Sequence, residues 1–170
     1  MSSSPRRSPL QVGDLVPEFT GTTESGSSIS SADLKGRPTV LFFYPKAGSP
    51  GCSIESREFA RRTPELSAVG VRVLGISVDP TEAQRSFRED CHLPFDLIAD
   101  PSREISKRFG VLGALGLARR TTFLLDADGR ILEVIRSWRP RHHVDAAVAR
   151  MAGAARSAEA RGTGPKSPPR

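Results

Sequence analysis

The 170-residue chain has only two cysteines, Cys52 and Cys91, and it has no Cys-x-x-Cys pair. Two cysteines are too few for a disulfide-built scaffold or a four-cysteine metal site. The missing Cys-x-x-Cys pair disfavours a disulfide-exchange enzyme of the thioredoxin kind. In a chain without a secretory signal, cysteines serve chemistry more often than cross-linking. Each cysteine is therefore a candidate reactive group.

Long apolar runs are also absent. No stretch approaches the roughly 20 apolar residues that span a bilayer. The basic start, Ser2 to Pro9, is not followed by an apolar segment, so a secretory signal is not expected. These absences predict a cytoplasmic protein without a membrane partner.

Metal-binding and nucleic-acid-binding patterns are missing as well. His142 and His143 are adjacent, so on a helix their side chains diverge by about 100° and are poorly placed to chelate one ion. We expect no metal and no cofactor. The net charge is +6, but the excess is scattered or terminal, without a basic helix face interleaved with aromatics. Weak attraction to polyanions is expected, without specific nucleic-acid binding.

The composition permits one substantial core, because 37% of the residues are hydrophobic. We expect one domain over residues 10–153. The flanking segments, 1–9 and 154–170, are rich in Ser, Pro, Gly and Arg. Such segments have too little apolar surface to fold, and we expect both to be disordered.

Strand and helix patterns alternate along the predicted domain. A small hairpin leads to Ile29, and five later segments are predicted strands, the last two of which form a hairpin: Thr39–Tyr44, Val71–Val78, Phe95–Ile98, Thr121–Leu125 and Arg130–Ile135. Helices are predicted to begin near Cys52, Pro80 and Asp100, and a last helix carries Val144 to Met151. Pro64 is expected to bend or split the first helix. The order predicts an α/β fold with a mixed central sheet flanked by helices.

Cys52 follows an apolar strand that stops abruptly at Pro45. A turn-rich segment then delivers the thiol to the start of a helical pattern. The unpaired N–H groups and the positive dipole end of that helix would face the sulfur. This setting favours the reactive thiolate. The alternative is that Cys52 is a small buried hydrophobic residue, the commonest fate of a free cysteine.

Four ordered segments resemble the peroxiredoxins, specifically the Q-type or bacterioferritin-comigratory branch. They are Phe42–Lys46 through Ser49-Pro50-Gly51-Cys52 with Glu55, Leu74–Asp79, Phe95–Asp100, and Arg120–Asp126 with Asp128-Gly129. The likeness covers about Leu10 to Ala152. It implies a thioredoxin-like fold of the peroxiredoxin variant. It also implies a thiol peroxidase that reduces hydrogen peroxide and organic hydroperoxides and serves antioxidant defence.

The resemblance implies roles for particular residues. Cys52 would be the nucleophile and would become a sulfenic acid. Ser49, where the family usually has Thr, would offer its hydroxyl to the thiolate or the peroxide. Arg120 would donate hydrogen bonds to both. Pro45 would shield the pocket, and the N–H groups of Gly51 and Cys52 could hold the distal oxygen.

Plain alternatives exist for several of these side chains. Ser49 could be only a cap, and either Arg119 or Arg120 could be a solvated loop charge. Glu55 could simply favour the first helical turn. Trp138 could line a partner surface, although packing against the last helix is the preferred expectation.

The recycling step is open at the level of sequence. Many Q-type members carry a second cysteine five positions after the first, where this chain has Arg57. Others carry it near the position of Arg88, about one helical turn before Cys91. Cys91 is therefore either a displaced resolving thiol or a structural cysteine. In the second case an external thiol, such as thioredoxin or a low-molecular-weight thiol, would act on Cys52.

Two further expectations complete the sequence-based picture. We expect a monomer or a weak dimer. The alternative to an enzyme is a peroxide-responsive redox sensor, or a thioredoxin-like binding module, without significant turnover.

Overall fold

The structure, a computed structural model, describes residues 9–162, with side chains described through Gly153. Its centre is one seven-stranded sheet in the order β2-β1-β5-β4-β3-β6-β7. The three central strands, β3, β4 and β5, are parallel, and the outer strands are antiparallel. The strands are β1 Thr20–Thr23, β2 Ser28–Ser30, β3 Thr39–Phe43, β4 Arg72–Ser77, β5 Leu97–Ala99, β6 Thr121–Leu125 and β7 Ile131–Arg136.

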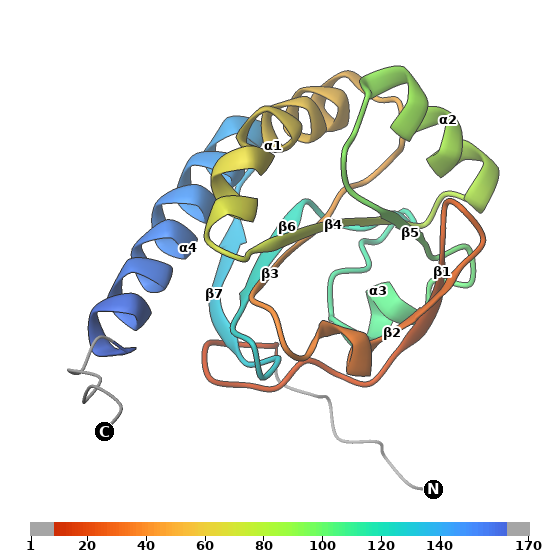
Figure 1. Cartoon of the computed structure of the whole chain (residues 1–170). Coiled ribbons are helices and arrows are strands. Elements are labelled where there is room, and N and C mark those ends of the chain that lie inside the picture. The colour runs from red at the N-terminus through yellow and green to blue at the C-terminus, as the bar shows by residue number, and fades with distance from the viewer. Residues whose placement is uncertain (1–8, 163–170) are drawn as a thin grey trace, which may run out of the picture.

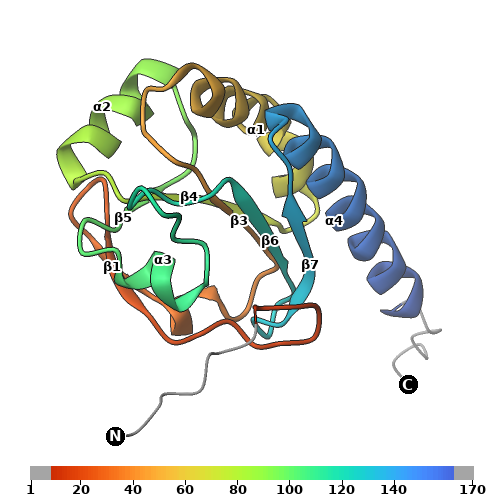
Figure 2. The same cartoon turned by 180° about the vertical axis from the view of Figure 1, so that it is seen from behind.

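Helices cover both faces of this sheet, as Figures 1 and 2 show from opposite sides. One face carries α1, α2 and α4, and the other carries α3 together with the short 3-10 turn η1. Their bounds are η1 Ser31–Leu34, α1 Pro50–Ala68, α2 Thr81–Cys91, α3 Glu104–Arg108 and α4 Pro140–Gly162. The predicted α/β architecture, with a mixed central sheet flanked by helices, is confirmed.

β3 explains why the core has two halves. All five of its residues are buried, as expected for an unbroken apolar strand in the middle of a sheet. Because successive side chains of a strand point to opposite faces, Val40 and Phe42 pack toward α1, α2 and α4, whereas Leu41 and Phe43 pack toward α3. The strand is thereby held on both sides, and its end has a defined position.

α1 begins as the sequence indicates. Ser49 has extended backbone angles and is the N-cap, and Pro50 is the first helical residue, where its missing N–H costs nothing. Cys52 lies two residues later, in the first turn. The predicted strand-to-helix junction is thus confirmed.

Pro64 does not split α1, contrary to one of the two outcomes expected for it. The helix is continuous through Ala68. Phe59 and Leu66, on either side of Pro64, are fully buried and belong to the same core as residues of α4. Packing of this face outweighs the single backbone hydrogen bond that proline removes.

The structure describes only part of the two predicted tails, residues 1–9 and 154–170. α4 continues to Gly162, beyond residue 153, where the sequence placed the end of the domain. The alanines of this segment have high helix propensity, which the compositional argument did not weigh. The remaining parts of the predicted tails, 1–8 and 163–170, lie outside the described residues.

Candidate active site

The segment before Cys52 is a loop that follows the end of β3. Ala47 donates its backbone N–H to Asp79 Oδ2 at 2.7 Å, and the Ser77 hydroxyl donates to the same oxygen at 2.7 Å. Ser77 ends β4, the parallel neighbour of β3. Parallel strands end at the same edge of a sheet, so a residue just after β4 can fasten the loop that follows β3.

Arg120 reaches the same edge from a distant part of the sequence. It directly precedes β6, which is antiparallel to β3 and pairs Thr121 with Phe43. Arg120 Nη2 lies 3.4 Å from Cys52 Sγ and donates a hydrogen bond to it. Of the two adjacent arginines, Arg120 is the one that contacts the sulfur.

Gly51 allows the guanidinium to approach closely. A Cβ at this position would lie only 3.0 Å from Arg120 Nη2. Such a distance is shorter than an ordinary van der Waals contact, so a side chain here would press on the arginine. The position before Cys52 is therefore occupied by glycine for a packing reason.

Glu55 is the second group that Arg120 contacts. Its Oε1 lies 3.2 Å from Arg120 Nη1, and the glutamate has no exposed surface. Among the described residues, neither carboxylate oxygen has a hydrogen-bond partner of good geometry. Burial raises the pKa of Glu55 from 4.5 to about 7, although the positive charge of Arg120 acts in the opposite direction. Glu55 lies beyond the first helical turn, so a helix-dipole role does not explain it.

Ser49 caps α1. Its hydroxyl oxygen accepts the Cys52 backbone N–H at 3.4 Å. The plain alternative of a cap is therefore realised, and it places the hydroxyl next to the backbone of the reactive residue. The Cys52 N–H thus donates to Ser49 in this structure, and its expected role as a donor to the peroxide stays a prediction.

Two other residues of the sequence-based site lie at its margin. Pro45 is half-buried in the bend directly after β3. Trp138 is 81% exposed, and the Arg139 guanidinium lies 5.1 Å from its ring centre. The expectation that Trp138 packs against the last helix is wrong.

A surface cavity adjoins Arg120. Its volume is about 600 Å³, and it is lined by Gly110, Val111, Arg119, Arg120, Thr121, Arg136, Ser137 and Trp138. The exposed indole and three arginines thus gather beside the buried active-site edge. Arg119 lines this cavity, whereas Arg120 is the arginine that contacts Cys52 Sγ.

Sequence reasoning missed two buried polar side chains near this edge. Gln84 accepts a hydrogen bond from the Tyr44 hydroxyl, and burial raises the pKa of Tyr44 well above its usual value. His143 pairs Nδ1 with the Thr122 hydroxyl at 2.9 Å and Nε2 with the Ser137 carbonyl at 2.8 Å. Tyr44 lies 40 positions from Gln84, and Thr122 lies 21 positions from His143, so no local pattern indicated these two side-chain pairs.

Cys91 is the last residue of α2 and is 7% exposed. It packs in the core that includes Phe87, Leu93 and Phe95. Both cysteines are free thiols.

Among residues 9–153, no three His, Cys, Asp or Glu side chains are grouped in a way that could hold a metal ion. Across residues 9–162, no helix combines the length and apolar character needed to cross a membrane.

The sequence profile of the AhpC/TSA family matches residues 12–134. The chain belongs to this family. It is 39% identical over 151 residues to a putative peroxiredoxin Bcp of Coxiella burnetii, an alignment that covers 85% of this chain and 97% of the relative. The family and the Q-type or bacterioferritin-comigratory resemblance are therefore confirmed, and with them the thiol-peroxidase class.

Solved structures agree with this assignment. The crystal structure of peroxidoxin BcpB from Mycobacterium tuberculosis superimposes with a TM-score of 0.79 at 35% identity and covers 85% of this chain and 97% of that one. A bacterioferritin comigratory protein of Xanthomonas campestris, studied for its alkyl peroxide reduction activity, superimposes with a TM-score of 0.76 at 26% identity, covering 81% and 92%. The thioredoxin-like fold of the peroxiredoxins is thus confirmed.

Proposed function

We propose that this peroxiredoxin reduces hydrogen peroxide and organic hydroperoxides with Cys52 as the nucleophile. The observation that carries the proposal is the contact of Arg120 Nη2 with Cys52 Sγ at 3.4 Å, at the start of α1. A fixed cation and a helix N-terminus at one sulfur both favour its negative charge. The alkyl peroxide reduction activity studied in the Xanthomonas campestris relative supports the inclusion of organic hydroperoxides.

The reaction follows from these charges. The Cys52 thiolate attacks one peroxide oxygen, the O–O bond breaks, and the other oxygen leaves with the electron pair of that bond. The products are a sulfenic acid on Cys52 and water or an alcohol, once the leaving oxygen has gained a proton. Arg120 stabilises the charge as it moves from sulfur to the leaving oxygen, and because its guanidinium is planar it can donate to both.

Ser49 and Pro45 act on the shape of the site. A hydroxyl accepts and donates at the same time, so Ser49 can keep the Cys52 N–H as its donor and direct its own proton toward the thiolate or the peroxide. Pro45 stiffens the bend between β3 and the loop and limits water access.

Access to the sulfur requires motion, because Cys52 has no exposed surface. The loop before it is the natural part to move. Lys46, Gly48 and Pro50 are exposed, and Asp79 holds this loop through a single backbone N–H, that of Ala47. Peroxide then enters when this loop or the Arg120 side chain shifts.

Replacing Cys52 by Ser tests the proposal, with Cys91→Ala as the matched cysteine control. In a single-turnover, stopped-flow measurement of peroxide consumption, the Cys52 variant should show only the uncatalysed rate. The Cys91 variant should react like the wild type. Circular dichroism checks that both variants fold. Retained peroxide consumption by a folded Cys52→Ser protein would overturn the proposal.

Recycling, location and assembly belong to the same proposal. We expect a thiol reductant to restore Cys52, a cytoplasmic location, and a monomer or weak dimer in solution. Size-exclusion chromatography with light scattering, on reduced and oxidised protein, measures the last of these.

A further inference from the structure

We propose that the cavity beside Arg120 binds the carboxylate end of an organic hydroperoxide. In this arrangement Arg136 pairs with the carboxylate, and the organic part of the substrate packs against Trp138. The inference rests on the proposed function and deepens it, because it makes a compact hydroperoxide with a carboxylate group a better substrate than its neutral counterpart.

Arg120 connects the cavity with the reactive sulfur. Its Nη2 lies 3.4 Å from Cys52 Sγ, and the same side chain lines the cavity. Cys52 has no exposed surface, so peroxide enters when the loop or the Arg120 side chain shifts. A shift of Arg120 opens the site toward this cavity. A hydroperoxide that reacts at Cys52 can then place the rest of its atoms there.

The cavity has room for an organic substituent. Its volume is about 600 Å³, and binding sites for small molecules usually measure about 300–1,000 Å³. Hydrogen peroxide, with its two oxygen atoms, would leave most of this space unfilled. The volume therefore favours a larger substrate.

Positive charge distinguishes the lining of this cavity. Arg119, Arg120 and Arg136 belong to it, and no acidic residue does. Within the part of the chain that the structure describes, only Arg120 of these three forms an ion pair, and its partner Glu55 is fully buried. Arginines whose charge no carboxylate of the protein neutralises attract a negatively charged ligand.

Arg136 is the best placed of these arginines to pair with a carboxylate. It is the last residue of β7 and pairs with Thr121, which directly follows Arg120, so both arginines stand at the same end of the hairpin. Its side chain is exposed and makes no hydrogen bond to the described residues. A free guanidinium can donate two parallel N–H groups to a carboxylate.

Arg119 is placed differently. Its side chain lies along the loop before it, since a Cβ at Gly113 would be 3.6 Å from its Cγ and 3.9 Å from its Nε. Arg119 adds to the positive charge of the cavity, and we assign the carboxylate contact to Arg136.

Trp138 supplies an apolar surface in the same cavity. It is the only tryptophan of the chain, and it is 81% exposed. The Arg139 guanidinium lies 5.1 Å from its ring centre and leaves most of the indole accessible. Aromatic rings with an accessible face pack well against aromatic and aliphatic groups of a ligand.

His143 holds the segment that carries this indole. β7 leads through Ser137 and Trp138 into α4, as Figure 2 shows. The Ser137 carbonyl can only accept, so His143 Nε2 donates to it at 2.8 Å, and Nδ1 of the neutral ring accepts from the Thr122 hydroxyl at 2.9 Å. Burial lowers the pKa of His143, which favours this neutral form. The exposed indole thus stands on an anchored backbone.

The carboxylate takes no part in the redox step. The Cys52 thiolate attacks one peroxide oxygen, the O–O bond breaks, and the other oxygen leaves with the bonding electron pair and gains a proton. The product is an alcohol that keeps its carboxylate. Pairing with Arg136 therefore acts on capture and orientation of the substrate.

The test compares two hydroperoxides that differ in charge, 4-(2-hydroperoxypropan-2-yl)benzoate and its methyl ester. Single-turnover, stopped-flow measurements on the full chain give a second-order rate constant for each. At low ionic strength the wild type should react about fivefold faster with the carboxylate, the upper end of what an exposed ion pair contributes. Added salt should bring the ratio toward one, because it screens exposed charges.

Three variants locate the effect. Arg136→Met should bring the ratio close to one at low salt, whereas Arg136→Lys, which keeps the charge, should retain most of the preference. Arg150→Met is the control, because Arg150 is an exposed arginine of α4, roughly 15 Å along the helix from Pro140, and its loss should leave the ratio at the wild-type value. Both substrates are measured on the same protein, so poor folding lowers both rate constants and does not change their ratio.

Tryptophan fluorescence gives a second readout, since Trp138 is the only reporter in the chain. The probe is 4-isopropylbenzoate, which has the carboxylate and lacks the hydroperoxide. It should change the emission of the wild type in a saturable way, and several-fold higher concentrations should be needed with Arg136→Met.

A wild-type ratio near one, a preference that persists in Arg136→Met, or emission that does not respond to the probe would overturn the inference. Each of these results leaves the reduction of both hydroperoxides by Cys52 intact. A folded Cys52→Ser protein that consumes either hydroperoxide removes the proposed function instead, so the two failures are distinguishable.

Discussion

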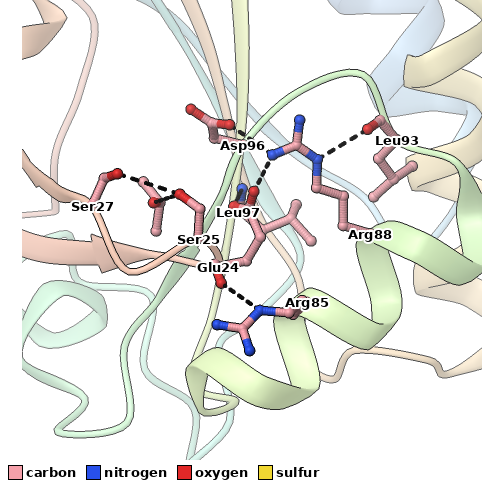
Figure 3. A network of polar contacts seen from close by, with 9 residues as sticks. Glu24, Ser25, Ser27, Arg85, Arg88, Leu93, Asp96 and Leu97 are labelled. Carbon is pink, nitrogen blue, oxygen red and sulfur yellow. Dashed lines mark hydrogen bonds and ion pairs between the residues drawn. The ribbon is translucent and has the colours of Figure 1, made fainter.

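Two buried glutamates face arginines in this structure, and the two pairs differ in how completely their hydrogen bonds are made. Glu24, which follows β1 and faces the last turns of α2, has both carboxylate oxygens hydrogen-bonded, one to Arg88 and one to the Leu97 N–H (Figure 3). Glu55, near Cys52, lies 3.2 Å from Arg120, yet both of its oxygens lack well-formed hydrogen bonds in the described part of the chain. The hydrogen bonds of the Glu24 carboxylate are complete, whereas those of the Glu55 carboxylate are not.

The difference separates a structural pair from a reactive one. Arg88 donates through Nε and Nη1 to Glu24, Asp96 and a main-chain carbonyl, all of which are groups of the protein itself. Arg120 divides its donors between a carboxylate and the Cys52 sulfur. Incomplete pairing is costly in a protein interior, and it persists mainly where function needs it.

The largest expected effect comes from breaking the reactive pair. Arg120→Met should lower the second-order rate constant for peroxide about 10²–10³-fold, the usual cost of removing one donor to a developing charge. Stopped-flow kinetics with hydrogen peroxide measures this. Arg119→Met, a neighbouring arginine in the cavity wall, is the matched control and should keep most of the rate. Equal losses in both variants would contradict the assignment of Arg120 to the sulfur.

Breaking the structural pair should affect stability instead of rate. Arg88→Met should lower the free energy of unfolding by about 2–4 kcal/mol, because it leaves Glu24 buried without its counter-charge. Urea denaturation measures the loss, and first-turnover peroxide consumption should stay at the wild-type rate. The control is Arg61→Met, which removes a surface pair with Glu58 and should leave the urea midpoint unchanged. A large rate loss in Arg88→Met would argue that the two regions are coupled.

Glu55→Gln should change how stability depends on pH. The pKa of Glu55 is about 7 in the folded protein and 4.5 in the reference state, so between these values the folded chain binds more protons than the unfolded chain. The free energy of unfolding of the wild type, relative to the Gln variant, should therefore fall as pH rises from about 4.5 to 7, by at most about 1.4 kcal/mol per pH unit.

Urea denaturation of both proteins from pH 5 to 8 measures this difference, and it should level off above the folded pKa. A Glu55 difference that does not vary with pH would mean that burial does not hold a proton on this carboxyl.

The smallest expected effect tests the contact between Gly51 and Arg120. Gly51→Ala places a Cβ 3.0 Å from Arg120 Nη2, so the guanidinium must shift by a few tenths of an ångström. The peroxide rate constant should fall by about tenfold or less. Gly153→Ala, in α4 with open space around it, is the control and should leave the rate unchanged while raising stability by about 0.5–1 kcal/mol. An unchanged rate in Gly51→Ala would show that Arg120 adapts freely.

Local patterns predicted much of the fold. The apolar run of β3, the Ser49-Pro50 helix start and the turn between β6 and β7 all formed where expected, since each depends on neighbouring residues. The match to a known family also predicted that Arg120 would serve Cys52. The Glu24–Arg88 pair was not foreseen, because its members lie 64 positions apart and neither stands in a recognisable motif.

Exposure was harder to predict than element type. Trp138 was expected to pack against the last helix, but its side chain is exposed to solvent. An aromatic residue gives no local sign of which way its segment turns. α4 extends past the domain boundary that composition suggested, because composition alone does not register the helix propensity of the alanines there.

By itself, the sequence determined that one thiol would stand at the start of a helix after a buried strand, because hydrophobic runs, proline and capping residues act over a few positions. Only the tertiary structure brings the Arg120 guanidinium to that thiol, places Glu55 against the same guanidinium, and fastens α2 at Gln84 and Arg88. The reason is physical: these contacts join segments through the pairing of strands and the packing of helices on them, and their strength depends on burial that no single segment can produce.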